Sequence, residues 1–327
     1  MFALTDPVDE QAMSNILTVT LNPALDLSTT VDRVVPEDKL RCDAPVLEAG
    51  GGGINVARAI GAMGGRAHAF VAISGYHGQQ FLDILRQEPL IPEVFHTHGE
   101  TRQSLAVTDR TSGEQFRFVM PGPRWTPEQA QEALEAIARV TPQRGYLVLS
   151  GSQPPGVPLH FPTQLAALMA DHSARLILDT SGAPLKALLK VGSARHHVLR
   201  LDGAESEELA GRKLSDIHAV ADFAEELITR GVAEVVVLAL GAEGSILVEG
   251  GNRWHACTQP VTVRSKVGAG DSFVGVFTWA VSQGARWEEA LVLGVAAASS
   301  AVTSDGTELC RRDQVDELAR TATLRRI

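Results

Sequence analysis

Short runs of aliphatic and β-branched residues alternate along the chain with stretches whose apolar residues are spaced like those of a helix. Few polar residues interrupt the apolar runs, which is typical of parallel strands covered by helices on both faces. The pattern predicts an α/β fold with a mostly parallel central sheet and a ligand site at the carboxyl ends of its strands. The predicted strands are residues 16–21, 67–74, 146–150, 175–179, 197–202 and 234–240.

Two segments break this pattern, residues 26–48 and 94–120, because they alternate polar and apolar positions and contain turn signals such as TSGE. We interpret them as hairpins that project from the main sheet, where they could cover a ligand or pair with a second subunit. Residues 1–15 lack the basic start and apolar centre of a signal peptide, so we expect a flexible extension before a single domain, residues 16–327.

The bulk properties exclude several classes of function. Hydrophobic residues make up 44% and charged residues 21%, as in ordinary globular proteins, and the formal net charge of -10 argues against binding a nucleic acid polymer. No segment approaches the roughly 20 apolar residues needed to cross a membrane, so we expect no membrane-spanning helix. Three widely separated cysteines suggest neither a disulfide framework nor a zinc site, and favour the cytoplasm.

A glycine–aspartate loop, VGAGDSFVGVF, precedes one predicted helix. Gly268 and Gly270 allow turns closed to other residues, and they let an anion approach the amides at the start of the helix. The helix dipole alone would favour the acid Asp271 in the first turn. Alternatively, its carboxylate takes a proton from a hydroxyl that attacks a phosphoryl group. The loop by itself does not decide between these interpretations.

A second loop, EAGGGGINVARAIGAMGG, has four consecutive glycines, Gly50–Gly53, before a helix that carries Asn55. So many glycines cost conformational entropy, which indicates a backbone pressed against a polar ligand such as a sugar. A dinucleotide loop is the alternative. Its G-x-G-x-x-G spacing fails at Val56, and the acid expected about 20 residues later is missing.

Together, GGGGINVAR and GAGDSF resemble the two signatures of the ribokinase-like carbohydrate kinases, the phosphofructokinase B family. The resemblance runs from about Ile16 to the C-terminus and implies a ribokinase-like three-layer sandwich with a small β-sheet lid. Within the family, the chain resembles the minor, B-type 6-phosphofructokinases. The segments that carry this likeness, in order, are LNPALD (21–26), EDKLRC (37–42), TRQSL (101–105), GEQFRFVMPG (113–122), SGSQPPGV (150–157) and DGTELC (305–310).

The resemblance implies a kinase that uses Mg²⁺ and transfers the γ-phosphoryl group of ATP to a sugar phosphate, most simply to the 1-hydroxyl of fructose 6-phosphate. It also implies a homodimer formed through the lid. Asp271 would be the base, and the amides of Gly268, Ala269 and Gly270 would stabilise the transferring group. The resemblance also implies residues that bind the sugar hydroxyls, Asp26, Gly52, Gly53 and Asn55, and residues that bind the existing phosphate, Lys39 and Arg102. The implied nucleotide-binding residues are Arg200, Asp202, Gly241, Gly244 and Lys266. The implied metal-binding residues are Asp202 and Glu205.

The chain departs from the family pattern on the nucleotide side. In RLDGAE, Asp202 replaces an asparagine and Arg200 a lysine, while Ala239 and Lys266 stand where hydroxyl residues are common. Our hypothesis is a re-tuned donor site, in which Lys266 supplies charge for the phosphates and Asp202 shares the metal with Glu205. Phosphorylation of tagatose 6-phosphate or fructose 1-phosphate remains an alternative, and so does a catalytically weak relative that binds sugar phosphate as a sensor.

Overall fold

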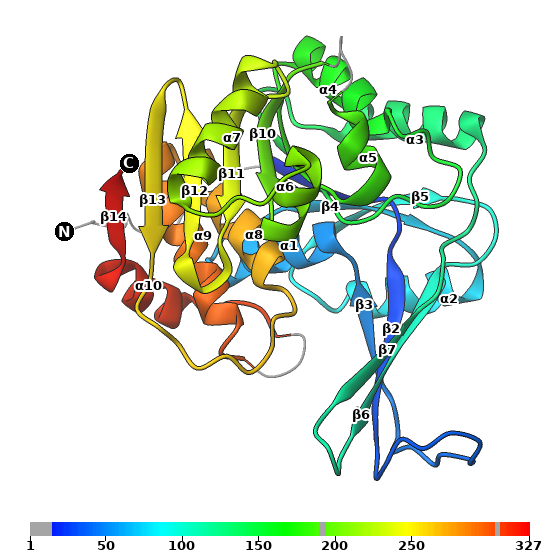
Figure 1. Cartoon of the computed structure of the whole chain (residues 1–327). Helices are drawn as coiled ribbons and strands as arrows, with labels where there is room; N and C mark the ends of the chain where they lie inside the picture. The colour runs from blue at the N-terminus through cyan, green and yellow to red at the C-terminus, as the bar shows by residue number, and fades with distance from the viewer. Residues whose placement is uncertain (1–14, 190–193, 305–307) are drawn as a thin grey trace.

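The computed structural model describes residues 15–189, 194–304 and 308–327, so the expected extension, apart from residue 15, and part of the DGTELC motif lie outside the described residues. Within those ranges, ten strands form the main sheet (Figure 1). Seven of them, β5, β4, β1, β8, β9, β10 and β11, pair in parallel, and β12, β13 and β14 add antiparallel pairs at one edge. In spatial order the strands are β14 (Thr323–Arg326), β13 (Asn252–Cys257), β12 (Ser245–Glu249), β11 (Ala233–Ala239), β10 (His196–Leu201), β9 (Arg175–Asp179), β8 (Tyr146–Ser150), β1 (Ile16–Thr20), β4 (His68–Ile73) and β5 (Ile91–His96).

Helices cover both faces of this sheet, which confirms the predicted three layers. The covering is possible because strands such as β1 and β8 are buried along their whole length and offer apolar side chains to both sides. On one face lie α1 (Gly52–Ala62), α2 (Gly75–Leu85), α8 (Ala269–Ser282), α9 (Trp287–Ala301) and α10 (Arg312–Thr321). On the other lie α3 (Pro127–Val140), α4 (Phe161–His172), α5 (Gly182–Ala187), α6 (Gly203–Ala210) and α7 (Ile217–Thr229).

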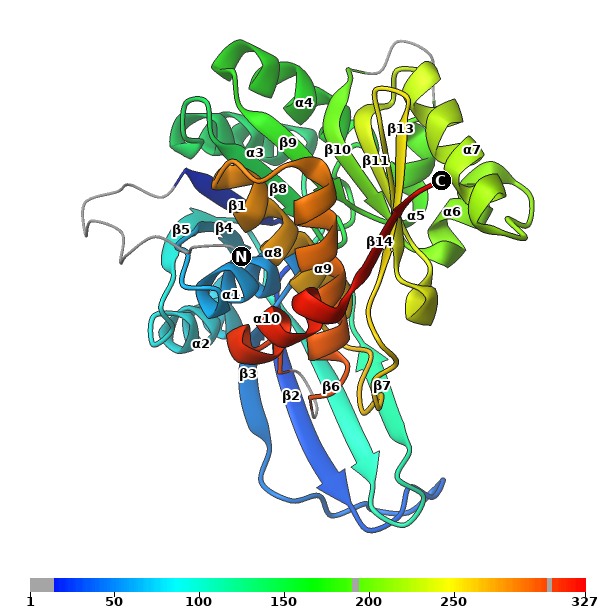
Figure 2. The same ribbon diagram turned by 90° about the vertical axis from the view of Figure 1, so that its left-hand side faces the viewer.

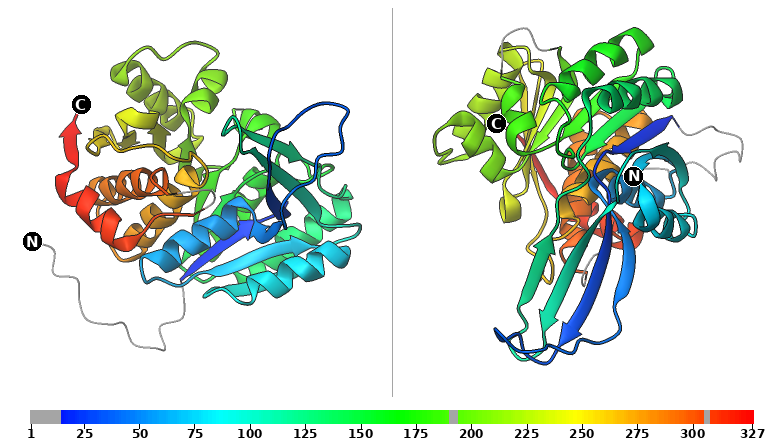
Figure 3. Two further views of the ribbon diagram at one scale, coloured as in Figure 1. Left: turned by 90° about the horizontal axis from the view of Figure 1, so that it is seen from below. Right: turned by 90° about the vertical axis from the view of Figure 1, so that its right-hand side faces the viewer.

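A smaller sheet projects from the main body, as Figures 2 and 3 show. It consists of two antiparallel hairpins whose inner strands, β2 and β6, pair in parallel. Its order is β3 (Val46–Gly50), β2 (Ala24–Val31), β6 (Arg102–Asp109) and β7 (Gln115–Val119). Both segments predicted as hairpins therefore contribute to it, and the parallel pairing joins them into one sheet.

The predicted start of the second hairpin, residue 94, is wrong. Residues 94–96 belong to β5, which pairs in parallel with β4 at the edge of the main sheet. Val94 and Phe95 point to opposite faces and pack against different hydrophobic cores. The mixed polar and apolar pattern of this segment reflects an edge strand that is only partly covered, and the small sheet takes its strands from residue 102 onwards.

The two faces of the small sheet differ in chemistry. Cross-strand register places Glu48, Asp26 and Ser104 side by side on one face. On the other face, register brings an apolar row together across all four strands, namely Leu47, Leu27, Leu105 and Phe118.

No helix in the described ranges has the length and apolar character that a membrane span requires.

Candidate active site

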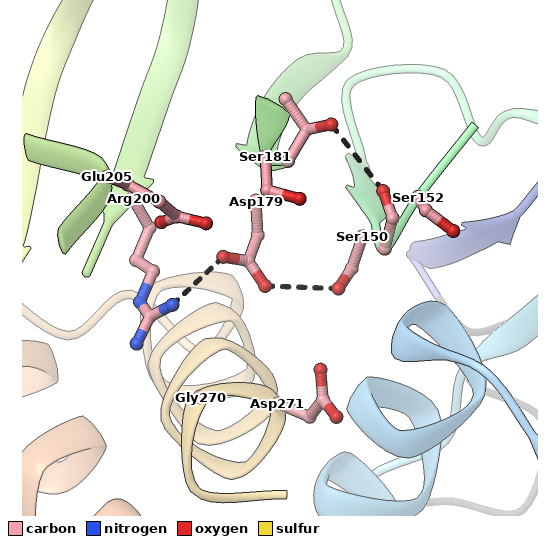
Figure 4. Close-up of a pocket in the computed structure, with 10 residues that line it drawn as sticks. Ser150, Ser152, Asp179, Ser181, Arg200, Glu205, Gly270 and Asp271 are labelled. Atoms are coloured by element: carbon pink, nitrogen blue, oxygen red, sulfur yellow. Dashed lines mark hydrogen bonds and ion pairs between the residues drawn. The ribbon is translucent and has the colours of Figure 1, made fainter. Parts of the chain in front are cut away.

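A pocket of about 200 Å³ opens at the carboxyl ends of β8, β9 and β10, where the strand pattern predicted a site. Figure 4 shows Asp179 between Arg200 and Ser150, with Asp271 facing them from the start of α8. Side chains from five elements therefore converge on one space. The lining residues are Ser150, Gly151, Ser152, Asp179, Thr180, Ser181, Arg200, Glu205, Gly270 and Asp271.

The first turn of α8 forms the floor of this pocket. Gly268 precedes the helix with φ of 75°, a left-handed conformation that glycine adopts at low cost, and a Cβ there would lie 2.5 Å from Leu309 Cδ2. The amides of the residues that follow, Ala269 and Gly270, belong to the first helical turn, whose N–H groups have no intrahelical acceptor. These N–H groups and the helix dipole make the position suitable for an anion.

Asp271 lies in the same turn. Asn55 Nδ2 donates a hydrogen bond to Asp271 Oδ2 over 2.9 Å. Burial raises the pKa of Asp271 to about 7, and the negative charge of Asp179 acts in the same direction, while Asn55, Arg200 and Ser150 lower it in part. A carboxylate with a pKa near 7 is a stronger base than the carboxylate of an ordinary aspartate, and part of its population is still ionised at pH 7.

Arg200 is the cation of the pocket. Its Nη1 lies 3.2 Å from Asp179 Oδ1, and the other oxygen of Asp179 accepts a hydrogen bond of 3.1 Å from Ser150 Oγ. The guanidinium passes directly beside Gly270, because a Cβ added at that glycine would stand 3.2 Å from both Nη atoms. Arg200 Nε is buried without a hydrogen-bond partner among the described residues. The arginine thus brings positive charge to the glycine loop where an anion would bind.

Asp202 and Glu205 begin α6 with a reciprocal capping box. Asp202 Oδ1 accepts from the Glu205 amide, and Glu205 Oε2 accepts from the Asp202 amide, each over 2.8 Å. Asp202 does not line the pocket, whereas Glu205 does. Burial raises the pKa of Glu205 to about 6, opposed by the hydrogen bond from the Asp202 amide and reinforced by the charges of Asp202 and Asp179.

The donor set of the pocket fits a divalent cation. Three carboxylates, Asp179, Glu205 and Asp271, face one arginine, so the ionised pocket carries excess negative charge. In the described parts of the chain, no three His, Cys, Asp or Glu side chains are grouped closely enough to hold a metal ion by themselves. That arrangement suits Mg²⁺, which usually binds one or two carboxylates and keeps its other positions for water and substrate phosphates.

The four glycines Gly50–Gly53 have a structural cause that the sequence prediction did not include. A Cβ at Gly52 would lie 2.5 Å from Ser150 Oγ, and one at Gly53 would lie 2.6 Å from Thr20 Oγ1. A Cβ at Gly50 would overlap Asp26 Oδ2. These glycines let α1 start against the ends of β1 and β8, so the number of glycines is not in itself evidence for a ligand. Gly52 packs against Ser150, which lines the pocket.

The small sheet brings Asp26 and Arg102 to neighbouring positions. Arg102 Nε donates to the carbonyl of Asn22 over 3.2 Å, and burial lowers the pKa of its guanidinium. Burial also raises the pKa of Asp26, while a hydrogen bond from Ser104 and the charges of Arg102 and Arg117 lower it in part. The acid and both arginines therefore act on one another across the face of the sheet that carries Asp26.

Lys39 and three predicted nucleotide residues lie away from the pocket lining. Lys39 is exposed in the loop between β2 and β3, at the end of the small sheet remote from Gly50 (Figure 1). Lys266 is exposed in the loop before α8. Gly241 and Gly244 flank a short turn after β11, and a Cβ at Gly244 would overlap the carbonyl of Ala256. Gly244 is therefore required by close packing on β13.

Six of the ten residues that line the pocket were not predicted as site residues, namely Ser150, Gly151, Ser152, Asp179, Thr180 and Ser181, and neither was Arg117 of the small sheet. Asp179 ends β9 and binds both Ser150 and Arg200, yet one aspartate after an apolar run gives no local motif. Its position at the carboxyl end of a predicted parallel strand was the available signal. Arg117, on β7, lies within GEQFRFVMPG, where alternation would have placed it on the same face as Asp26 once the pairing of β6 with β7 was known.

Comparison with known proteins agrees with this geometry. The family model described as pfkB family carbohydrate kinase matches residues 19–314. The chain is 39% identical over 306 residues to ATP-dependent 6-phosphofructokinase isozyme 2 of Escherichia coli (strain K12), which covers 94% of this chain and 98% of that protein. It is 32% identical over 259 residues to a 1-phosphofructokinase of Xanthomonas campestris pv. campestris, covering 79% of this chain and 81% of that one. The crystal structure of phosphofructokinase-2 from Escherichia coli in complex with fructose-6-phosphate superposes with a TM-score of 0.86 at 37% identity, covering 94% of this chain and 99% of that one.

Proposed function

Because the chain belongs to the pfkB family of carbohydrate kinases, we propose that it phosphorylates the 1-hydroxyl of fructose 6-phosphate with ATP to give fructose 1,6-bisphosphate. The observation that carries this proposal is Asp271. Its carboxylate lines the pocket at the start of α8, with a pKa of about 7, next to amides suited to an anion and beside Arg200.

The proposed reaction is an in-line phosphoryl transfer. The acceptor oxygen attacks the γ-phosphorus, its proton moves to Asp271, and the bond to the β–γ bridging oxygen breaks so that ADP leaves. The amides of Gly268, Ala269 and Gly270 hold the oxygens of the transferring group, and Arg200 adds charge beside Gly270. Mg²⁺, when bound, neutralises the phosphate oxygens of the nucleotide. Glu205, which lines the pocket, would hold the Mg²⁺ ion, with the charge of Asp202 beside it.

The sugar phosphate lies between α1 and the small sheet in this proposal. Asp26, Asn55 and the backbone of Gly52 and Gly53 hold its hydroxyls, since carboxylate and amide groups pair well with a polyol. Arg102 binds the existing phosphate, which would replace the neutral oxygens that its guanidinium contacts at 3.2 to 3.5 Å. We favour fructose 6-phosphate for two reasons. The Escherichia coli relative, which has the higher identity of the two described above, is a 6-phosphofructokinase, and the similar crystal structure is a complex with fructose-6-phosphate.

We further propose a homodimer through the small sheet. Its apolar face leaves Leu47, Phe116 and Phe118 exposed, and both of its edges are unpaired in the described chain. Since Lys39 lies at the tip of the sheet, it meets the phosphate of a sugar only if the tip of one subunit reaches the pocket of another.

A cytoplasmic location accords with three cysteines that are all free.

Turnover of the purified protein tests the function. Fructose 6-phosphate, fructose 1-phosphate and tagatose 6-phosphate are each offered with ATP or pyrophosphate, and products are identified by ³¹P NMR. We expect the highest kcat/KM with fructose 6-phosphate and ATP. Preference for fructose 1-phosphate would support the activity named for the Xanthomonas relative. Binding of fructose 6-phosphate without turnover by any donor would instead identify a sensor.

A further inference from the structure

One guanidinium behind the pocket is bound to the acid–base machinery through a single amide. Arg58 Nη1 donates to Asn55 Oδ1 over 2.9 Å, and Asn55 Nδ2 donates to Asp271 Oδ2 over 2.9 Å. Asn55 and Arg58 can meet because residues three apart share one face of α1. The proposed base is thus connected to an arginine that does not itself line the pocket.

Arg58 is held on every side. Its Nε and Nη2 each lie 2.6 Å from one oxygen of Glu88, a bidentate ion pair, and Nη2 also donates to the carbonyl of Ala49 over 2.7 Å. Glu88 lies in the turn between α2 and β5, and Ala49 lies in β3 at the root of the small sheet. Both partners are largely covered, with side-chain exposures of 25% for Arg58 and 21% for Glu88. This cation is therefore fixed in position more firmly than an exposed surface arginine.

The chemistry of these groups fixes which way the amide of Asn55 faces. A guanidinium can only donate, so the amide oxygen must face Arg58. The amide nitrogen then faces Asp271 and donates, which favours the ionised carboxylate. Without Arg58, a half-turn of the amide would point its oxygen at Asp271, and that contact is favourable only when the carboxyl is protonated. Orientation of one amide therefore decides whether the base is ready to accept a proton.

We propose that Arg58 is a positioning residue, which together with Glu88 holds the Asn55 amide in the orientation that donates to Asp271. The proposal rests on the proposed role of Asp271 as the base. The other groups that face Asp271 are the carboxylate of Asp179 from β9, the guanidinium of Arg200 from β10 and the hydroxyl of Ser150 from β8. Asn55 from α1 and Ser150 are the neutral groups among them, and of these two it is Asn55 whose side chain is hydrogen-bonded to Arg58.

The test compares Arg58→Met, which keeps the apolar stem, with Arg58→Lys, which can still donate to Asn55. Arg58→Met should lower kcat about 10- to 100-fold and move the acid limb of kcat/KM to a pH higher by about 1, so that raising the pH restores part of the loss. Arg58→Lys should recover much of this effect. Arg286→Met removes an exposed arginine paired with Glu289 and serves as the matched control, with no expected change.

A merely structural role gives a different result. It would lower the melting temperature of Arg58→Met while its acid limb stays at the wild-type pH, and that outcome overturns the proposal. If Arg58→Met does not fold, Glu88→Gln must shift the limb in the same direction by a smaller amount, and an unmoved limb overturns the proposal equally.

The two proposals can fail separately. If the wild-type protein shows no kinase turnover, the proposed function fails, but ¹³C NMR of labelled aspartate carboxyls still compares the titration of Asp271 in wild type and Arg58→Met. An Asp271 that titrates at a higher pH in the variant supports the positioning role, and an identical titration refutes it.

Discussion

The proposed donor and acceptor halves of the site satisfy their charges in opposite ways. On the donor half, Arg200 is paired with Asp179, and Asp202 and Glu205 cap α6 together. On the acceptor half, whose residues lie on the small sheet outside the pocket lining, Arg102 contacts neutral oxygens at 3.2 to 3.5 Å and Arg117 is exposed. The donor half is thus held in place by the protein's own ion pairs, whereas the arginines of the acceptor half have binding capacity left for a phosphate.

The capping box accounts for Asp202 at the position where the resemblance implies an asparagine. Asn and Asp are equally good helix N-caps, so α6 begins in the same way with either residue. The aspartate places one more negative charge beside Glu205. The pKa of Glu205 is raised to about 6, mainly by burial and in smaller part by the charges of Asp202 and Asp179. A local structural role and an electrostatic effect on the donor are therefore combined in one side chain.

The largest expected effect belongs to neither half, because Asp271 serves both. Asp271→Asn should lower kcat by about 10³-fold, since the proton of the attacking hydroxyl loses its acceptor, while KM for each substrate stays within about threefold. Initial rates with each substrate varied in turn measure this. Asp313→Asn, in the first turn of α10, is the control. An Asp271→Asn enzyme with parental turnover would remove the basis of the proposed mechanism.

The next effect is confined to the acceptor half. In Gly50→Ala, the new Cβ overlaps the carboxylate of Asp26, which must move. We expect KM for fructose 6-phosphate to rise about 10- to 100-fold, as for the loss of a charged hydrogen bond, with KM for ATP unchanged. Gly61→Ala is the control, because Gly61 lies in the neighbouring helix α1 and has open space around its Cβ. A rise in KM for ATP of equal size would show that the halves are not separable.

The pH dependence follows from the raised pKa of Asp271. Below pH 7 the carboxyl is increasingly protonated and cannot act as a base, so log kcat/KM should fall with a slope of about 1 per pH unit.

The free energy of unfolding should also depend on pH. Because the folded-state pKa of about 7 exceeds the ordinary 3.8, the folded state binds more protons between these values, and stability should decline as pH rises through this window. Urea unfolding should show this decline reduced in Asp271→Asn. A rate profile that is flat down to pH 5 would contradict the assignment.

The smallest expected effects concern the donor half alone. Lys266→Thr and Asp202→Asn each change one charge of the proposed nucleotide site. Each should alter KM for ATP about three- to tenfold, as expected for about 1 kcal/mol of partly screened interaction. KM for the sugar phosphate should stay within about twofold. Lys213→Thr, an exposed lysine paired with Glu207, is the control. Equal changes in both KM values would refute a re-tuned donor site.

The sequence was sufficient to predict those features that are local in the chain. The buried strands and the helix that carries Asp271 follow from periodicity, glycine conformations and helix termini, whereas the role of its loop came from the family resemblance and stays a prediction. What it could not provide are features made by pairing across the fold. Asp179 needs Arg200 from the neighbouring strand, and β12, β13 and β14, which were not among the predicted strands, join the sheet only through antiparallel pairing with one another and with β11.

The position of Lys39 and the cause of the four glycines were missed for the same reason. Lys39 belongs to an implied motif, but a motif does not say how far a hairpin carries it from the pocket. For the glycines, the deciding neighbours are Thr20, Asp26 and Ser150, which come from three different strands. Their crowding can be recognised only after β1, β2 and β8 are placed beside one another.

The parallel pairing of β2 with β6 has a consequence for how the chain reaches its native state. β3, α1, β4, α2 and β5 all intervene between these partners, so closing the small sheet costs the loop-closure entropy of this long segment, and docking of β4 and β5 lowers that cost. During synthesis, the first hairpin must wait as two strands, which are marginally stable alone. The small sheet should therefore be among the last parts to fold and would not survive excision as an independent module.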